Sequence, residues 1–424
     1  MLRRSKALAA RAAYLCACAF VTVHFLFLPF GGYERMMEGK YFCFLALALG
    51  LCAAMAFAAP LPRPEKPRAS SGVMRLAAAA YLAFSALSAL CSPYGARTLL
   101  GGTRREGLLT LALYGALFFA FAAHLRADRR LVALLAASAA LGGALVLAQT
   151  AGYDPFGLYP AGWNYFDGDV AYAGRFAGTA GNADFTAFLL ALAVCVLAAA
   201  MLRLRMWRLA PALALALAAL WRLDVAGAWL GISFAALWSP ALLFPQKRAR
   251  MLLLSALLSA CALLAVRYVP WEGGALAEAR ALLRGEFDPT FGSSRLFIWQ
   301  NCLPLVRERP LLGGGPDTLW LRALPALDWY RGGELVPADV TAAHNEYLGV
   351  LVNQGALALG AYLALLGTAL ARCFRRAGED ARFVLCGAGL LCYAAMALFS
   401  VSTCITAPYV WMLLSIVHKD EIDC

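Results

Sequence analysis

Apolar residues occur along this chain in blocks that short polar segments separate. Clear examples run from Ala12 to Phe30, Tyr41 to Pro60, Leu131 to Thr150 and Met251 to Val269. As helices, such blocks are long enough to cross about 30 Å of hydrocarbon. They lack the two-residue alternation of barrel strands, and only helices or closed barrels satisfy all backbone polar groups in lipid. The pattern therefore predicts membrane-spanning helices.

The whole pattern predicts an all-α, polytopic integral membrane protein of about twelve transmembrane helices, with residues 1–424 as a single membrane domain. The expected spans are 12–30, 41–60, 74–91, 107–125, 131–150, 183–201, 207–221, 225–244, 251–269, 345–371, 383–400 and 404–418.

The basic residues alternate between the two sets of loops that these spans create. One set, which includes both chain ends, carries 22 Lys and Arg residues, and the opposite set, without its one long loop, carries 7. Cytoplasmic loops carry the excess of Lys and Arg. Both termini are therefore expected in the cytoplasm. The net charge of +12 follows from this topology and does not indicate a nucleic-acid partner.

Composition agrees with a membrane protein. The chain is 62% hydrophobic and 15% charged, with a mean hydropathy of +0.68, whereas ordinary globular proteins are about 25% charged. Most of the 13 cysteines, for example Cys16, Cys195 and Cys386, lie inside the expected spans. They are interpreted as small buried apolar residues and not as a disulfide framework.

Two long segments fall on the extracytoplasmic side, 151–182 and 270–343. The second has 74 residues and helical signals of its own. Its stretch from Ala275 to Glu286 has one apolar and one polar face, which suits a helix along the membrane surface. A second helix is expected from Ser294, followed by a glycine-rich turn from Arg309 to Pro316. Long structured loops often carry function.

Histidine is scarce, and only one histidine faces outward. His24, His124 and His418 lie in a span or at cytoplasmic edges, whereas His344 lies where the tenth span begins. An imidazole has an unperturbed pKa near neutrality, which makes His344 the natural candidate for a proton acceptor. The alternative is an ordinary polar residue at the membrane interface.

Outward arginines form the second group of candidates. Arg175 and Arg295 are flanked by glycine, small and aromatic residues, and Arg104 and Arg105 form a further basic patch. Guanidinium groups bind phosphate oxygens through two parallel hydrogen bonds. Anchoring to lipid headgroups is the alternative interpretation.

Metal and nucleotide sites are less well supported. Asp167 and Asp169 could hold a divalent cation beside a diphosphate, although Asp-Gly is also an ordinary turn signal. The chain has no His/Cys cluster with zinc spacing and no phosphate-binding glycine motif in its cytoplasmic loops. We therefore expect no metal, no other cofactor and no ATP-driven pump.

Three segments together resemble the bacterial O-antigen ligase and O-antigen polymerase family. The first runs from Arg175 through Gly181-Asn182-Ala183-Asp184, and the second from Arg295-Leu-Phe-Ile-Trp299 through Arg309-Pro-Leu-Leu-Gly-Gly-Gly315. The third begins at His344-Asn345-Glu-Tyr-Leu and runs through Asn353-Gln-Gly355. They cover roughly residues 170 to 371, and the earlier spans match in number and hydropathy alone.

The resemblance implies a glycosyltransferase of the bacterial plasma membrane with a GT-C-like architecture. It would transfer a glycan from an undecaprenyl-diphosphate-linked donor to a glycan or lipid acceptor on the outer face, without a metal. Arg175 and Arg295 would bind the diphosphate, and His344 would help to deprotonate the acceptor hydroxyl. Substrate contacts are expected from further residues: Arg104, Arg105, Asn182, Arg222, Trp299 and Asn345.

The chain departs from the family pattern in two places. Asn182-Ala183-Asp184 stands where the family often has Asn-Pro-Asn, and Val225-Ala226-Gly227 where it often has Ser-Arg-Gly. Arg222 could supply the basic contact that the second departure removes.

A secondary transporter or a flippase of twelve helices is the alternative function. A transporter would predict inverted repeats and paired broken helices, which the sequence does not indicate.

Overall fold

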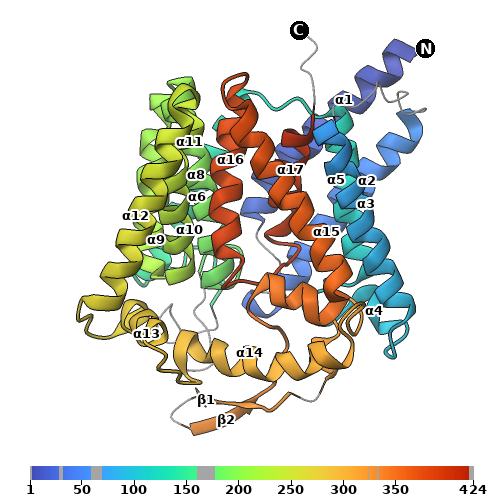
Figure 1. The fold of residues 1–424 in the computed structure, drawn as a ribbon. Coiled ribbons are helices and arrows are strands. Elements are labelled where there is room, and N and C mark those ends of the chain that lie inside the picture. The colour runs from blue at the N-terminus through green and yellow to red at the C-terminus, as the bar shows by residue number, and fades with distance from the viewer. Residues whose placement is uncertain are drawn as a thin grey trace.

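The computed structural model describes residues 2–27, 32–58, 69–159, 177–322, 324–331 and 334–419. Long helices run roughly side by side, with the start of the first and the end of the last at the same end of the bundle (Figure 1). The helices that coincide with the expected spans are α1 (Leu2–Ala19) with the π-helix η1 (Phe20–His24), α2 (Met36–Ala58), α3 (Ala69–Leu90), α5 (Leu108–His124), α6 (Arg129–Thr150), α8 (Ala183–Leu204), α9 (Ala210–Leu223), α10 (Ala226–Trp238), α12 (Arg248–Tyr268), α15 (Glu346–Arg376), α16 (Ala381–Met396) and α17 (Ala407–His418).

Eight of the described helices are long and apolar enough to cross a membrane. The other four expected spans correspond to the shorter helices α5, α9, α16 and α17. The chain is therefore a polytopic, predominantly α-helical membrane protein, and the count of twelve spans stays a prediction.

Asparagine and aspartate side chains begin several of these helices. Asn182 accepts a hydrogen bond from the backbone N–H of Asp184 at the start of α8, and Asn345 accepts one from Leu348 at the start of α15. A side-chain oxygen at this position satisfies one of the N–H groups that the first helical turn leaves unpaired. The helix starts near the expected outer face are thus encoded locally.

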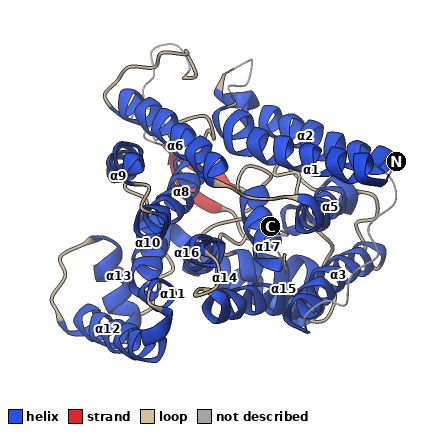
Figure 2. Cartoon of the chain, turned by 90° about the horizontal axis from the view of Figure 1, so that it is seen from above, coloured by secondary structure: helices blue, strands red, loops and turns tan. Residues whose placement is uncertain are grey.

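The helices pack around α8, which is almost completely buried. It lies against α16, α9 and α10, while α3 packs on α15 and α5 on α17. Viewed along the bundle, α12 lies at the rim, where little of its surface is covered (Figure 2). Its exposed face is apolar, as expected of a helix that contacts lipid.

The segment 270–343 lies at the end of the bundle opposite the start of α1. It contains α13 (Gly274–Leu283) and α14 (Phe291–Glu308), and α14 crosses beneath the long helices (Figure 1). Both helices were expected. A short antiparallel pair of strands, β1 (Leu327–Arg331) and β2 (Glu334–Ala338), was not expected, and it is a local addition to an all-α fold. Short helical turns complete the structure: η2 (Tyr33–Arg35), α4 (Arg97–Leu100), η3 (Trp207–Leu209), α11 (Pro240–Leu243), η4 (Pro245–Lys247) and η5 (Leu319–Leu321).

Candidate functional site

The helix α15 is broken where the glycine-rich turn meets it. Gly355 has a φ of 84° inside the helix, and a side chain there would collide with the backbone of Leu311. The break frees carbonyl groups, and the turn uses them: Gly314 N–H donates to the Val352 carbonyl at 3.1 Å, and Gly315 N–H donates to the Asn353 carbonyl at 2.6 Å. The glycines therefore join the second motif segment to the third. The sequence did not predict this broken helix.

His344 lies in the connection just before α15. Its φ of 47° is unusual for a residue with a side chain. The preceding carbonyl, of Ala343, accepts a hydrogen bond from the indole Nε1 of Trp299 at 2.9 Å, and the following residue is the cap Asn345. Contacts on both sides thus hold His344 in place.

The imidazole of His344 is far less basic than its unperturbed pKa suggests. Burial, together with the positive charges of Arg104 and Arg295, lowers the pKa of His344 to about 3. His344 is therefore neutral throughout the physiological pH range. It can accept a proton during a reaction, but it cannot retain one.

Arg295 follows three consecutive residues in the left-handed conformation, Gly292, Ser293 and Ser294. This turn folds the chain back, so that Arg295 Nη1 donates to the Gly292 carbonyl at 2.8 Å, and Nη2 lies 3.6 Å from Asp184 Oδ2. Ser294 therefore does not have the extended conformation of a typical helix cap. The Nε of Arg295 is buried and finds no hydrogen-bond partner within the described part of the chain, so it is available to a ligand.

The Arg295–Asp184 contact joins the second motif segment to the first, because Asp184 is the last residue of the first segment. Lys40 supports the same segment from α2. This fully buried side chain donates to Thr179 Oγ1 at 3.2 Å and to the carbonyl groups of His24 and Phe25 at 2.5 and 3.0 Å. All three motif segments therefore meet around Arg295 and His344.

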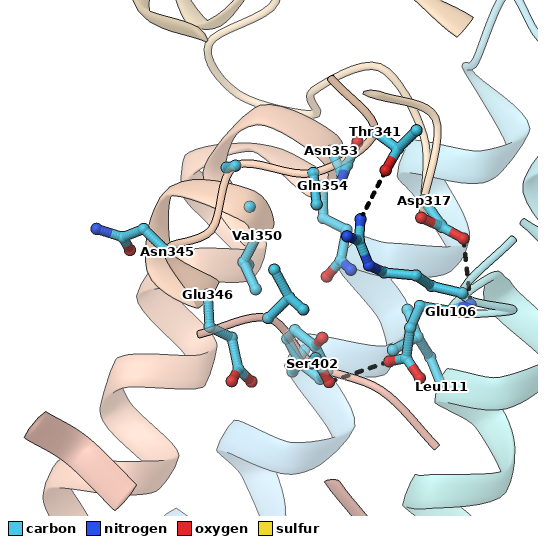
Figure 3. Close-up of a pocket in the computed structure, with 16 residues that line it drawn as sticks. Glu106, Leu111, Asp317, Thr341, Asn345, Glu346, Val350, Asn353, Gln354 and Ser402 are labelled. Atoms are coloured by element: carbon cyan, nitrogen blue, oxygen red, sulfur yellow. Dashed lines mark hydrogen bonds between the residues drawn. The ribbon is translucent and has the colours of Figure 1, made fainter. Parts of the chain in front are cut away.

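A small cavity lies beside the His344 connection. Its volume is about 70 Å³, and its lining includes Ala343, Asn345, Glu106, Arg104 and Ser402 (Figure 3). Arg104 Nη1 donates to Thr341 Oγ1 at 3.1 Å. Burial lowers the pKa of the Arg104 guanidinium, and the carboxyl groups of Asp317 and Glu106 act in the opposite direction.

Asp317 holds the loop that carries Arg104. Its Oδ2 accepts a hydrogen bond from the backbone N–H of Gly102 at 2.7 Å and another from that of Glu106 at 3.2 Å. Figure 3 shows the second of these bonds. A side chain at Gly101 would collide with Asp317, which explains the glycine at that position. Burial raises the pKa of the Asp317 carboxyl, while these two N–H groups and Arg104 lower it.

The remaining predicted residues are more dispersed. Arg105 Nη2 lies 3.9 Å from Glu38 Oε1, and Arg222 Nη2 donates to the Thr150 carbonyl at 3.0 Å, where α6 ends. In the structure Arg222 thus contacts a helix end. Three predicted residues lie outside the described part of the chain: Arg175, Asp167 and Asp169.

Sequence reasoning missed the acidic and hydroxyl side chains of the site, Glu106, Asp317, Thr341 and Ser402. Two signals pointed to them in retrospect. Glu106 directly follows the Arg104-Arg105 pair, and Asp317 directly follows the glycine-rich turn and Pro316. A buried carboxyl at a membrane interface is costly unless it is hydrogen-bonded, so such residues often have a specific role.

Residues 211–363 match a family model described as O-antigen ligase. The matched stretch begins in α9 and ends inside α15, so it contains Arg222, Arg295 and His344. It confirms the resemblance that the motif segments predicted. Arg104 and Glu106 lie before it in the chain. A comparison with curated proteins found no match.

Proposed function

We propose that this protein, a bacterial membrane protein of the O-antigen ligase family, transfers a glycan from an undecaprenyl-diphosphate-linked donor to an acceptor hydroxyl. The acceptor would be a glycan or a lipid. Glycan transfer of the O-antigen ligase type is what the family match supports. The match gives no support to the alternative of a transporter or flippase.

The observation that carries the proposal is the convergence of arginines on His344. Arg104 and Arg295 come from segments almost two hundred residues apart in the sequence, yet both lie close enough to His344 to lower its pKa. Two guanidinium groups close to the same histidine favour binding of an anion with several oxygen atoms, such as a diphosphate. Arg295 also has a buried, unpartnered Nε, and Arg175 would extend the same group of cations.

The reaction would proceed by direct displacement at the anomeric carbon. The arginines hold the diphosphate and stabilise the negative charge that it gains as the leaving group. His344, neutral at physiological pH, takes the proton of the acceptor hydroxyl as the new bond forms. The lipid-diphosphate donor supplies the free energy, so the proposal needs neither a nucleotide nor a metal.

The topology that we propose places this site outside the plasma membrane. Residues 1–424 would form one integral membrane domain with both termini in the cytoplasm and with 270–343 as an extracytoplasmic loop. The position of α13 and α14 at the end of the bundle opposite the start of α1 supports this arrangement (Figure 1).

Purified protein in detergent or in vesicles, supplied with a lipid-diphosphate-linked glycan and an acceptor glycolipid, tests the function. We expect a new glycosidic product and one equivalent of free lipid diphosphate. Movement of the intact donor across the vesicle membrane without a new bond would instead identify a flippase and contradict the proposal.

A further inference from the structure

The carboxyl group of Glu106 faces the cavity beside His344. Its Oε1 accepts a hydrogen bond from the hydroxyl of Tyr114 at 2.6 Å. Its Oε2 accepts one from Ser402 at 3.0 Å, as Figure 3 shows. Each carboxylate oxygen has a second lone pair, so both oxygens can accept another proton donor. Glu106 is 8% exposed and is one of the residues that line the cavity.

The cavity connects this carboxyl group with the connection that carries His344. Ala343 and Asn345, on either side of His344, line it together with Glu106 and Ser402. Its volume of about 70 Å³ is several times what one water molecule needs. Water or a substrate hydroxyl can therefore occupy it and form a hydrogen-bonded path between its two walls.

The two groups differ in their ability to keep a proton. The pKa of Glu106 is raised to about 8, chiefly by burial. The hydrogen bonds from Tyr114 and Ser402 lower it, and the charges of Asp317 and Glu346 raise it. The pKa of His344 is about 3. Glu106 therefore binds a proton more tightly than His344 does, and a proton that reaches His344 is more stable on Glu106.

We propose that Glu106 is the residue that holds the proton of the acceptor hydroxyl after glycan transfer. This inference rests on the proposed function. In the step, the hydroxyl oxygen bonds to the anomeric carbon, and the carbon–oxygen bond to the diphosphate breaks with its electron pair on the diphosphate. The proton leaves the hydroxyl through His344, crosses the cavity and ends on a Glu106 oxygen. The protonated carboxyl later releases it to the outside solution.

Ser402 suits the last step of this path. Its hydroxyl donates to the ionised Glu106, and the same oxygen can accept a hydrogen bond once Glu106 is protonated. The titratable or charged groups around Glu106 are Arg104 on its own loop, Asp317 after the glycine-rich turn, Tyr81 on α3, Tyr114 on α5, Glu346 on α15 and Cys404 before α17.

The test is the pH dependence of transfer by the full-length protein between pH 6 and pH 9.5. Glu106 must be ionised to take the proton, so kcat of the wild type should fall about tenfold per pH unit below a pKa near 8. Glu106→Gln should remove this pH dependence and lower kcat roughly 100-fold at pH 9, with a smaller loss at pH 6. Glu106→Asp should retain the pH dependence at a reduced rate.

Glu272→Gln, an exposed change in the outer segment, is the matched control and should behave as the wild type. A pH dependence that persists in Glu106→Gln would overturn the inference, as would a wild-type kcat that is constant from pH 6 to pH 9. The second result needs no variant, so the inference can be tested even if Glu106→Gln does not fold. Wild-type protein that forms no product at any pH would instead contradict the proposed function.

Discussion

The indole Nε1 of Trp299 donates a hydrogen bond to the backbone carbonyl of Ala343, 2.9 Å away. This bond joins α14 to the residue just before His344, across 44 positions of sequence. The ring of Trp299 also packs on Phe399, with 6.0 Å between the ring centroids. Trp299, expected from the sequence to contact substrate, thus has a structural contact that fixes the position of His344.

The first prediction follows from this contact. Trp299→Phe keeps an aromatic ring against Phe399 but removes the N–H donor. A neutral hydrogen bond contributes about 0.5–1.5 kcal/mol, so we expect kcat to fall roughly 2- to 10-fold with little change in donor affinity. The measurement is kcat and donor KM for the two proteins. A large rise in donor KM with kcat unchanged would instead indicate that the indole binds the donor directly.

The second prediction concerns the cation that contacts the first motif segment. Arg295→Lys keeps the positive charge and loses the planar group with its parallel donors. We expect roughly 100- to 1000-fold less glycan transfer, with normal amounts of protein in the membrane. Near-normal transfer by Arg295→Ala would rule out the role in diphosphate binding.

Arg222→Ala serves as the comparison for Arg295. The Arg222 guanidinium donates to the Thr150 carbonyl at the end of α6, so its removal should affect a helix end more than the reaction. We expect a lower melting temperature and a modest loss of transfer. A loss as large as that of Arg295→Lys, in protein of normal stability, would place Arg222 in the donor site.

The apolar blocks predicted the helices well, because a long apolar segment in lipid must satisfy its own backbone hydrogen bonds and therefore forms a helix. The positions of α13 and α14 were also predictable, since local amphipathicity and turn signals determine them. The break at Gly355 was not, because its cause lies in the turn at 311–315, which inserts its backbone into the helix. A sequence pattern contains no information about such an insertion.

The same reasoning separates the predictable site residues from the others. Arg295 stood out because glycine, small and aromatic residues flank it, and His344 stood out because it is the one histidine expected on the outer side. Glu106 did not stand out, because a carboxyl next to two arginines suggests a surface ion pair. The structure instead directs its side chain to Tyr114 and Ser402. That environment depends on Ser402, which is 296 positions away in the sequence.

The third prediction tests the topology. Asp288, exposed between α13 and α14, and Arg205, exposed after α8, lie in loops that the charge pattern assigns to opposite sides of the membrane. In a background with the exposed Cys91 and Cys261 replaced by serine, Asp288→Cys should react with an impermeant thiol reagent on intact cells or spheroplasts. Arg205→Cys should react only after the cells are lysed. The reverse pattern would place the site in the cytoplasm.

The final prediction concerns His344 and metal. Burial keeps the imidazole of His344 neutral down to about pH 3, so His344 itself should cause no loss of activity between pH 5 and pH 8. A residue that takes a proton in the transition state contributes about 100- to 10,000-fold in rate. We expect His344→Ala to lose transfer to this extent. His344→Gln should not restore it, because an amide can accept a hydrogen bond but cannot carry the proton. Donor binding should change less than kcat in both variants.

EDTA distinguishes this mechanism from a metal-dependent one. Asp167 and Asp169, the residues considered for a metal, lie outside the described part of the chain. The reaction that we propose uses guanidinium groups to stabilise the leaving diphosphate, so the purified wild type should transfer glycan at the same rate with and without EDTA. Loss of activity in EDTA that magnesium or manganese restores would refute this prediction. In that case the double change of Asp167 and Asp169 to alanine should reduce transfer as much as His344→Ala does.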